Sequence, residues 1–272
     1  MGSLNADLVQ RVKRLPNPGE TISGGDLQTF SGGKGANQAY AAARLGARVN
    51  MVGCVGDDEL GAFLLREVEA SGVDVSRVST VDSPTGVATI LVSETGGNSI
   101  VVSPGANARL TPDTVVEKLE GMTRNDFLLC QLETPIDTVG AALKTAKQIN
   151  ATTILDPAPP EHFSVSYWYY ADILTPNESE TEALSGSSDP SASDLKGLHE
   201  SVVNLWELGA GDVVLKLGSA GCYYAQGRES GLVAGFAVDA VDTTAAGDTF
   251  NAALAIALSE KESMASALRF AN

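Results

Sequence analysis

The sequence has few of the residues on which most metal sites and hydrolytic sites depend. Its three cysteines, Cys54, Cys130 and Cys222, lie far apart among 272 residues and form no C-x-x-C pair. This spacing argues against a disulfide framework and a thiolate zinc site, and it favours a reducing compartment, which we take to be the cytoplasm. The two histidines, His162 and His199, form no H-E-x-x-H motif. We therefore expect histidine to take no part in the chemistry.

Positive charge and long apolar runs are also scarce. Eighteen Lys and Arg residues stand against thirty-four Asp and Glu residues, which gives a formal net charge of -16 and argues against a nucleic-acid partner. No apolar run approaches the ~20 residues that a membrane helix needs. Asn5 and Asp7 interrupt the start of the chain, unlike a signal peptide. With 43% hydrophobic residues, the chain can bury a sizeable core as one large domain or two small ones.

Hydrophobic patterning predicts an α/β fold. From about residue 112, apolar runs of strand length alternate with helical periodicity, which implies βαβ units and a mostly parallel sheet. Two β-rich segments, near 7–30 and 86–105, break this alternation, and we expect them to form a small second sheet. The predicted helices are 35–45, 59–71, 112–121, 135–149, 178–185, 191–209 and 246–258. The predicted strands and hairpins are 49–55, 86–103, 127–132, 152–157, 171–176, 212–217 and 221–238.

The strongest local motif is DAVDTTAAGDTFN, residues 239–251, between a strand and an Ala-rich helix. Ala246 and Gly247 allow a tight turn at the helix start, where unpaired amides and the helix dipole favour a phosphate. Asp248 follows in the first turn. Its carboxylate can act as a general base for an attacking hydroxyl, or it can simply cap the helix. The local pattern leaves both open.

A second glycine-rich turn, SGGKGANQ at residues 31–38, also enters a helix. It is not a Walker loop, because Gly35 follows Lys34 where Ser or Thr is needed. Lys34 and Asn37 offer polar groups to a small ligand at this turn. Asn5 and Asp7 fall on one face of an extended segment, which suits polyol hydroxyls, although the local pattern favours a simple turn.

Further polar residues follow predicted strands, where open α/β sheets bind ligands. Glu133 follows 127–132, and Gly218 to Gly221 follow 212–217. Asn177 and Glu180 lie one turn apart at a helix start, which can orient metal-bound water or phosphate oxygens. An exposed helix face explains the same spacing.

Eight motifs in this order resemble the ribokinase-like (PfkB) family of carbohydrate kinases, over essentially the whole chain. The motifs are GSLNAD (2–7), GGKGANQA (32–39), SPGAN (103–107), QLETP (131–135), LDPAP (155–159), LTPNESE (174–180), KLGSAG (216–221) and DTTAAGDTFN (242–251).

This resemblance implies a single kinase domain over residues 1–272. Its expected fold is a three-layer α/β/α sandwich with a β lid formed by the two segments near 7–30 and 86–105. It implies transfer of the γ-phosphoryl group of ATP to the 5-hydroxyl of ribose, with Mg²⁺ and an activating K⁺, and a homodimer formed through the lid. The chain has AAGD at 245–248 where the wider family often has GAGD, a difference that favours the ribose branch.

The resemblance also assigns roles to residues. Asp248 is the expected base, and the amides of Ala245, Ala246, Gly247 and Asp248 form the expected anion hole. The expected sugar contacts are Asn5, Asp7, Gly33, Lys34, Asn37 and Glu133. The expected nucleotide contacts are Asn177, Lys216, Gly218, Ser219, Gly221, Gly247 and Asn272. Glu180 is expected to hold Mg²⁺ through water, and Asp242 and Thr244 to bind the monovalent cation.

Two departures from the family pattern leave alternatives open. Lys216 stands where the family often has Thr. Family members also have a full strand before the segment at 2–7 and continue past residues 269–272, so the resemblance implies a chain that is short at both ends. A kinase for another sugar or a nucleoside, and a sugar-binding module without turnover, are the alternatives to ribose phosphorylation.

Overall fold

The computed structural model describes residues 1–160, 165–186 and 192–272. His162 and the first residue of the helix expected at 191–209 lie outside the described residues. In the described part, no helix combines the length and apolarity needed to cross a bilayer. Cys54, Cys130 and Cys222 are all buried and unpaired.

The main sheet has six strands in the order β12-β11-β10-β9-β8-β7. Its four parallel strands are β7 (Phe127–Cys130), β8 (Thr152–Leu155), β9 (Ile173–Leu174) and β10 (Asp212–Lys216). The antiparallel hairpin β11 (Gly221–Gln226) and β12 (Glu229–Ala234) extends it at one edge. The mostly parallel central sheet expected from the alternating pattern is therefore confirmed.

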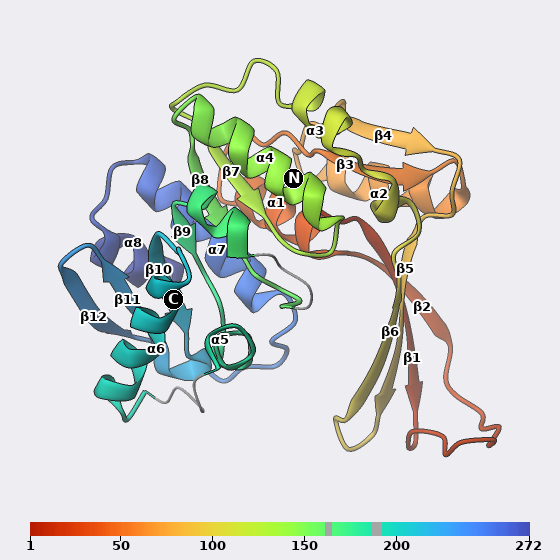
Figure 1. Cartoon of the computed structure of the whole chain (residues 1–272). Helices are drawn as coiled ribbons and strands as arrows, with labels where there is room; N and C mark the ends of the chain where they lie inside the picture. The colour runs from red at the N-terminus through yellow and green to blue at the C-terminus, as the bar shows by residue number, and fades with distance from the viewer. Residues whose placement is uncertain (161–164, 187–191) are drawn as a thin grey trace.

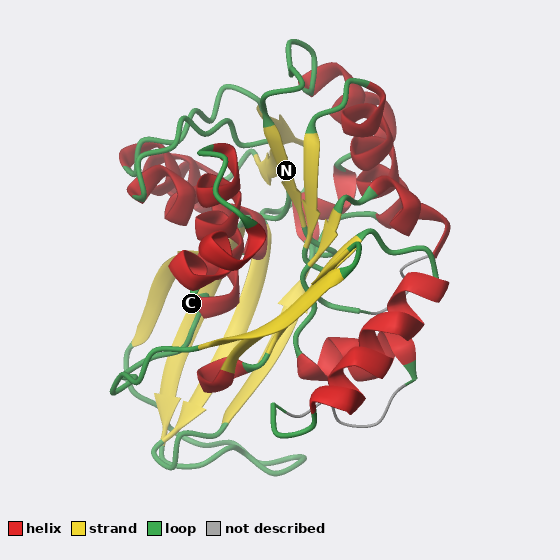
Figure 2. Ribbon diagram, turned by 90° about the vertical axis from the view of Figure 1, so that its left-hand side faces the viewer, coloured by secondary structure: helices red, strands yellow, loops and turns green. Residues whose placement is uncertain are grey.

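Helices cover both faces of this sheet (Figure 2). One face packs on α3 (Pro112–Lys118), α4 (Ile136–Gln148), α5 (Glu178–Ser185) and α6 (Leu195–Glu207). The other packs on α7 (Ala246–Ser259) and α8 (Met264–Ala271), with α1 (Lys34–Arg44) against α7. Successive strand residues supply the two cores, because Leu155 belongs to the first cluster and Ile154 to the second.

A second sheet of four strands, order β2-β1-β5-β6, projects from this body as an arm (Figure 1). Its strands are β1 (Asn5–Val12), β2 (Leu27–Gly32), β5 (Gly86–Ser93) and β6 (Asn98–Ser103). β1 pairs with β5 in parallel, so the two β-rich segments form one sheet. A small parallel pair, β3 (Gly53–Gly56) and β4 (Val78–Val81), packs beside α2 (Glu59–Ala70).

Several boundaries differ from the sequence-based prediction. The strand expected at 49–55 is regular only from Gly53, because residues 49–51 bond to Asp74 through an isolated bridge. The strand expected at 171–176 shortens to Ile173–Leu174, since Pro176 carries no N–H to continue the ladder. The hairpin ends at Ala234, and β4 and α8 were not predicted at all.

Candidate functional site

Four polar side chains meet at the carboxyl edge of the main sheet. Glu133 follows β7, Asp156 follows β8, Asn177 follows β9, and Lys216 ends β10. These four strands are mutually parallel and adjacent, so their carboxyl ends lie along one edge. The strand order therefore gathers residues that are up to 83 positions apart in the printed sequence.

The glycine turn before α1 approaches β1 very closely. Gly33 has a φ of 89°, and a Cβ there would lie 2.8 Å from the backbone nitrogen of Asn5. A Cβ at Gly32 would lie 2.2 Å from the Asp7 carboxylate. Glycine is needed at both positions because any side chain would collide with β1. The turn thus brings Lys34 and Asn37 next to Asn5 and Asp7.

Glu133 ties these segments together. Its Oε2 accepts hydrogen bonds from the Ser3 hydroxyl at 2.5 Å, the Lys34 amide at 3.1 Å and the Asn5 side-chain amide at 3.5 Å. Asn107 Nδ2 donates to Asn5 Oδ1 at 2.8 Å and fixes the orientation of that amide. Burial, and then the charge of Glu133, raise the pKa of Asp7 to about 6. The result is a compact polar floor that can accept and donate hydrogen bonds to hydroxyl groups.

Asp248 lies in the first turn of α7 and is 5% exposed. Its Oδ2 accepts from Asn37 Nδ2 at 3.0 Å, and its Oδ1 accepts from Gln38 Nε2 at 3.1 Å. These bonds run to α1, so the carboxylate faces α1 and the capping interpretation is wrong. Burial raises the pKa of Asp248, while the nearby Lys34 ammonium opposes that rise. A carboxylate so placed suits a general base.

The start of α7 differs in one detail from the expected anion hole. Ala245 adopts the left-handed conformation, with a φ of 58°, and closes a turn in which the Ala246 amide donates to the Thr243 carbonyl at 3.2 Å. That amide is already bonded, contrary to the expectation for all four. Within the part of the chain that the structure describes, the amides of Gly247 and Asp248 donate to no backbone carbonyl. These two amides are therefore available to an anion at the helix start.

Asn177 and Glu180 form a reciprocal capping box at the start of α5. Asn177 Oδ1 accepts from the Glu180 amide at 2.8 Å, and both Glu180 carboxylate oxygens accept from Asn177. Glu180 is buried, which contradicts a purely exposed helix face. Burial, and then the charge of Asp156, raise the pKa of Glu180.

Two ammonium groups lie among the carboxylates. Lys216 Nζ is 2.8 Å from Asp156 Oδ1, in an ion pair whose side chains are 13% and 3% exposed. Burial by itself would lower the pKa of Lys34, but the charges of Asp156, Asp248, Glu133 and Glu180 raise it above the ordinary value. Four carboxylates face two ammonium groups here. The excess negative charge is suited to a divalent cation.

For the other expected residues, the described part of the structure shows no hydrogen bond to this cluster. Asp242 and Thr244 are exposed, and the Thr244 amide donates to Asp242 Oδ1 at 2.8 Å. Gly218 and Ser219 are exposed in a short turn after β10, whereas Gly221 is buried. Asn272 donates to the Val233 carbonyl at 3.2 Å.

Four residues of the site were not singled out from the sequence. They all lie inside the quoted motifs, and the buried strand before Asp156 was the available signal for that residue. The four are Ser3, Gln38, Asn107 and Asp156.

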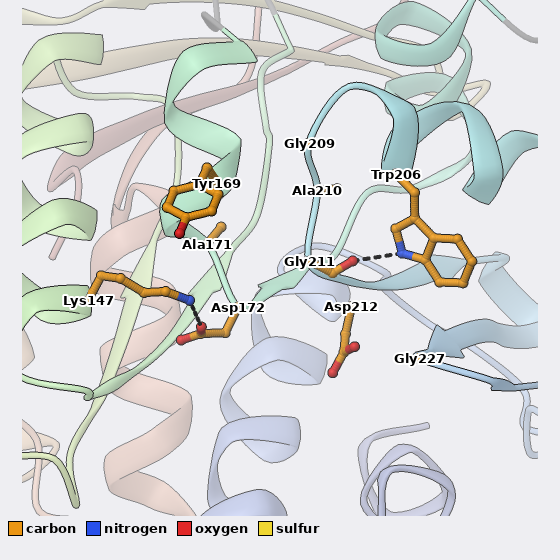
Figure 3. Close-up of a pocket in the computed structure, with 10 residues that line it drawn as sticks. All are labelled: Lys147, Tyr169, Ala171, Asp172, Trp206, Gly209, Ala210, Gly211, Asp212 and Gly227. Carbon is orange, nitrogen blue, oxygen red and sulfur yellow. Dashed lines mark hydrogen bonds and ion pairs between the residues drawn. The ribbon is translucent and has the colours of Figure 1, made fainter.

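A cavity of about 630 Å³ lies at the opposite edge of the sheet, by the amino ends of β9 and β10 (Figure 3). Several of its polar groups already have partners, because Lys147 pairs with Asp172 at 2.6 Å and Trp206 Nε1 donates to the Gly211 carbonyl at 2.8 Å. It contains none of the residues described above. The candidate site is therefore the polar cluster at the carboxyl edge, where open α/β sheets bind ligands.

Comparison with known proteins agrees with this geometry. The sequence matches the pfkB family carbohydrate kinase over residues 1–272. It is 41% identical to a ribokinase of Bacillus subtilis, covering 100% of this chain and 89% of the relative, and 39% identical to a ribokinase of Haemophilus influenzae, covering 99% and 88%. The structure of Arabidopsis thaliana ribokinase complexed with ribose and ATP superposes with a TM-score of 0.90 at 35% identity, covering 99% of this chain and 88% of that one. This chain therefore belongs to the pfkB family of carbohydrate kinases.

Proposed function

We propose that this chain is an ATP-dependent ribokinase that converts ribose and ATP to ribose 5-phosphate and ADP. The observation that carries the proposal is the buried Asp248 carboxylate, bonded to Asn37 and Gln38 beside the free amides at the start of α7. A base and an anion-binding helix start meet there, as phosphoryl transfer to a hydroxyl requires. The similarity to ribokinases over the whole chain points to the same reaction.

In this mechanism the ionised Asp248 takes the proton of the 5-hydroxyl. The electron pair left on the hydroxyl oxygen forms the new bond to the γ-phosphorus. The bond between that phosphorus and the oxygen bridging to the β-phosphate breaks, and its electrons leave with ADP. The amides of Gly247 and Asp248 stabilise charge on the transferring group, and Ala245 shapes the turn that directs them. The raised pKa of Asp248 makes it a stronger base than an exposed aspartate.

The polar floor around Glu133 supports a sugar site. We assign the hydroxyl contacts to Asn5, Asp7, Gly33, Lys34, Asn37 and Glu133. Each of the carboxylates can accept a hydrogen bond from a hydroxyl group, and the side-chain amides can both donate and accept. These contacts should decide which sugar the enzyme accepts, since a site built to hydrogen-bond a hydroxyl group rejects sugars that lack it.

The nucleotide is assigned to the neighbouring edge. We place its contacts at Asn177, Lys216, Gly218, Ser219, Gly221, Gly247 and Asn272. Among the described residues, no group of three His, Cys, Asp or Glu side chains is arranged to chelate a metal. Mg²⁺ bound to the phosphates, with Glu180 reaching it through water, fits the excess of carboxylates and the bonds that Glu180 already makes to Asn177. Magnesium supplies charge neutralisation of the phosphates.

An activating K⁺ is assigned to Asp242 and Thr244. Their exposed oxygens are of the hard type that suits this ion. The buried, reduced cysteines are consistent with a cytoplasmic enzyme. We treat residues 1–272 as one kinase domain whose four-stranded arm closes over the sugar.

A homodimer through the arm is the proposed assembly. The register of the strands places Phe30, Ile100 and Val102 on the face that also carries Asp7. These three apolar side chains are 48%, 52% and 47% exposed. A second copy covering this face would bury them, and light scattering should give twice the monomer mass. A monomeric mass would contradict the dimer.

The function is tested by coupled ADP release with a panel of pentoses, 2-deoxyribose, hexoses and nucleosides, with and without K⁺. We expect ribose to give the highest kcat/KM, and Asp248→Asn to lower kcat by about 10²- to 10⁴-fold with ribose affinity retained. Turnover of another sugar alone would identify a different kinase of this family. Ribose binding without any ADP release would identify a binding module, and an active Asp248→Asn protein would reject Asp248 as the base.

A further inference from the structure

Two residues of the recognised motifs have no part in the reaction as described, yet both are buried beside Asp248. Gln38 belongs to α1 and Asp156 follows β8, and each is 2% exposed. A buried polar side chain costs free energy unless it is hydrogen-bonded. Their bonds therefore indicate what these two residues stabilise.

Gln38 bridges two carboxylates. Its Nε2 lies 3.1 Å from Asp248 Oδ1 and 3.2 Å from Asp156 Oδ2, so each amide hydrogen can serve one carboxylate. Gln131 Nε2 donates to Gln38 Oε1 at 2.7 Å and fixes which end of the amide faces them. The reversed amide would place its oxygen against two negative charges. The observed orientation is therefore strongly preferred.

Asp156 connects this bridge to the phosphate side. Its other oxygen, Oδ1, accepts from Lys216 Nζ at 2.8 Å. A Cβ built on Gly247 would lie 3.4 Å from the same Nζ, so the ammonium group lies beside the first turn of α7. The Asp156 carboxylate thus bonds to both Gln38, which orients Asp248, and the Lys216 ammonium group, which lies beside the first turn of α7.

We propose that Gln38 and Asp156 are positioning residues that hold the base and the phosphate-binding turn in one fixed frame. Gln38 aims the Asp248 carboxylate, and Asp156 anchors both Gln38 and Lys216. This inference rests on the proposed kinase function. It assigns a role to the glutamine of GGKGANQA and to the aspartate of LDPAP, neither of which contacts the reacting atoms.

The charged groups around Asp248 give the inference a distinctive signature. Lys34 faces it from α1 and Asp156 faces it from the end of β8, while Lys216 of β10 is paired with Asp156. Glu133 and Glu180 act on Lys34. After burial, which raises the pKa of Asp248, the bond from Gln38 lowers it and the charge of Asp156 raises it. Removing Gln38 and removing the charge of Asp156 should therefore shift that pKa in opposite directions.

The experiment compares Gln38→Met, Gln38→Glu and Asp156→Asn with the unmodified protein. The pH dependence of kcat with ribose and ATP is measured, together with carboxyl ¹³C NMR titration of Asp248, whose signal is identified by its loss in Asp248→Asn. Gln38→Met should lower kcat by about 10- to 100-fold and leave both KM values within about threefold. The acid limb and the NMR midpoint should move to higher pH in both Gln38 variants and to lower pH in Asp156→Asn.

Gln38→Glu keeps the size of the side chain and an acceptor for Gln131, but it places a carboxylate against Asp248 and Asp156, so it should raise the pKa of Asp248 further than Gln38→Met. Asp156→Asn removes a negative charge instead of adding one, and it tests the inference independently of the folding of the Gln38 variants. Gln226→Met is the matched control for the loss of a glutamine donor. Gln226 Nε2 donates to Asp212 Oδ2 at 2.7 Å, where Asp212 begins β10 at the opposite edge of the sheet. This control should retain the kcat, the acid limb and the Asp248 titration of the unmodified protein.

Failure of the inference and failure of the proposed function give different results. A protein that releases no ADP with ribose contradicts the function, while the NMR titration still reports on the positioning of Asp248. An active protein in which Gln38→Met keeps kcat within about twofold and leaves the Asp248 titration unmoved overturns the inference. It is also overturned if Gln226→Met reproduces the changes, or if Asp156→Asn shifts the titration in the same direction as Gln38→Met.

Discussion

The buried ion pair between Lys216 and Asp156 makes a quantitative prediction about stability. Its atoms lie 2.8 Å apart, and the two side chains are 13% and 3% exposed. With an effective dielectric constant of about 20, the attraction at that distance is about 6 kcal/mol, and desolvation of both charges offsets most of it. Removing one partner leaves the other buried without its counter-charge. We expect Lys216→Met to lower the free energy of unfolding by about 3 kcal/mol and Asp156→Asn by about 2 kcal/mol, since Lys216 keeps more contact with solvent.

The double variant separates the pair from its surroundings. Because the second substitution no longer strands a charge, the double variant should lose about 3 kcal/mol rather than the sum of about 5, a coupling of about 2 kcal/mol. Urea unfolding followed by the fluorescence of Trp168 and Trp206 measures all four proteins. The exposed pair Lys196 and Glu200, at 3.4 Å with side chains 87% and 64% exposed, is the control cycle and should couple by less than about 0.5 kcal/mol. Equal coupling in the two cycles would refute the reasoning.

Two further substitutions test the polar floor around Glu133 and the turn before α7. The pKa of Asp7 is raised to about 6 in the folded protein. Above that pH the ionised carboxylate is less favourable in the folded protein than in the unfolded chain, which lowers the free energy of unfolding. Asp7→Asn should therefore raise the free energy of unfolding of the unliganded protein by about 1 kcal/mol at pH 7.5, after allowance for solvent screening of this partly exposed group. Calorimetry should show this gain fading as the pH falls from 6 toward 4, and titration calorimetry should show weaker ribose binding; a gain that persists at pH 4 would contradict the electrostatic cause. Ala245→Gly relieves a non-glycine φ of 58° and should raise the free energy of unfolding by about 0.5–1 kcal/mol, so a lower Tm would reject strain at this turn.

Local patterns in the sequence predicted much of the framework. The acidic helix at 178–185 was predicted with its observed bounds, and in the structure Asn177 and Glu180 form a capping box at its start. The glycine turn before α1 was placed correctly, since the residues that permit that turn are adjacent in the chain. The turn before α7 was expected at Ala246 and Gly247, whereas Ala245 is the residue in the left-handed conformation and Gly247 lies inside α7. Strand ends could be located, and with them Glu133 and Asn177 as residues of one edge, whereas Lys216 was named only through the family resemblance.

Contacts between distant segments could not be predicted from such patterns. The parallel pairing of β1 with β5 joins segments separated by some eighty residues, and no local periodicity specifies a partner strand. The apolar run at 171–176 likewise did not show that β9 pairs with β8 and β10 over Ile173 and Leu174 alone.

The sequence by itself determined the fold class, the family and the identity of the polar residues at the helix starts and strand ends. The tertiary structure alone decided that Asp248 faces α1 rather than capping its own helix, since Asn37 lies 211 residues earlier in the chain. It also decided that Gln38 and Asp156, 118 residues apart, share a hydrogen bond. The physical reason is that propensity and capping act within a few residues, whereas the direction of a buried carboxylate depends on the donors that packing brings to it.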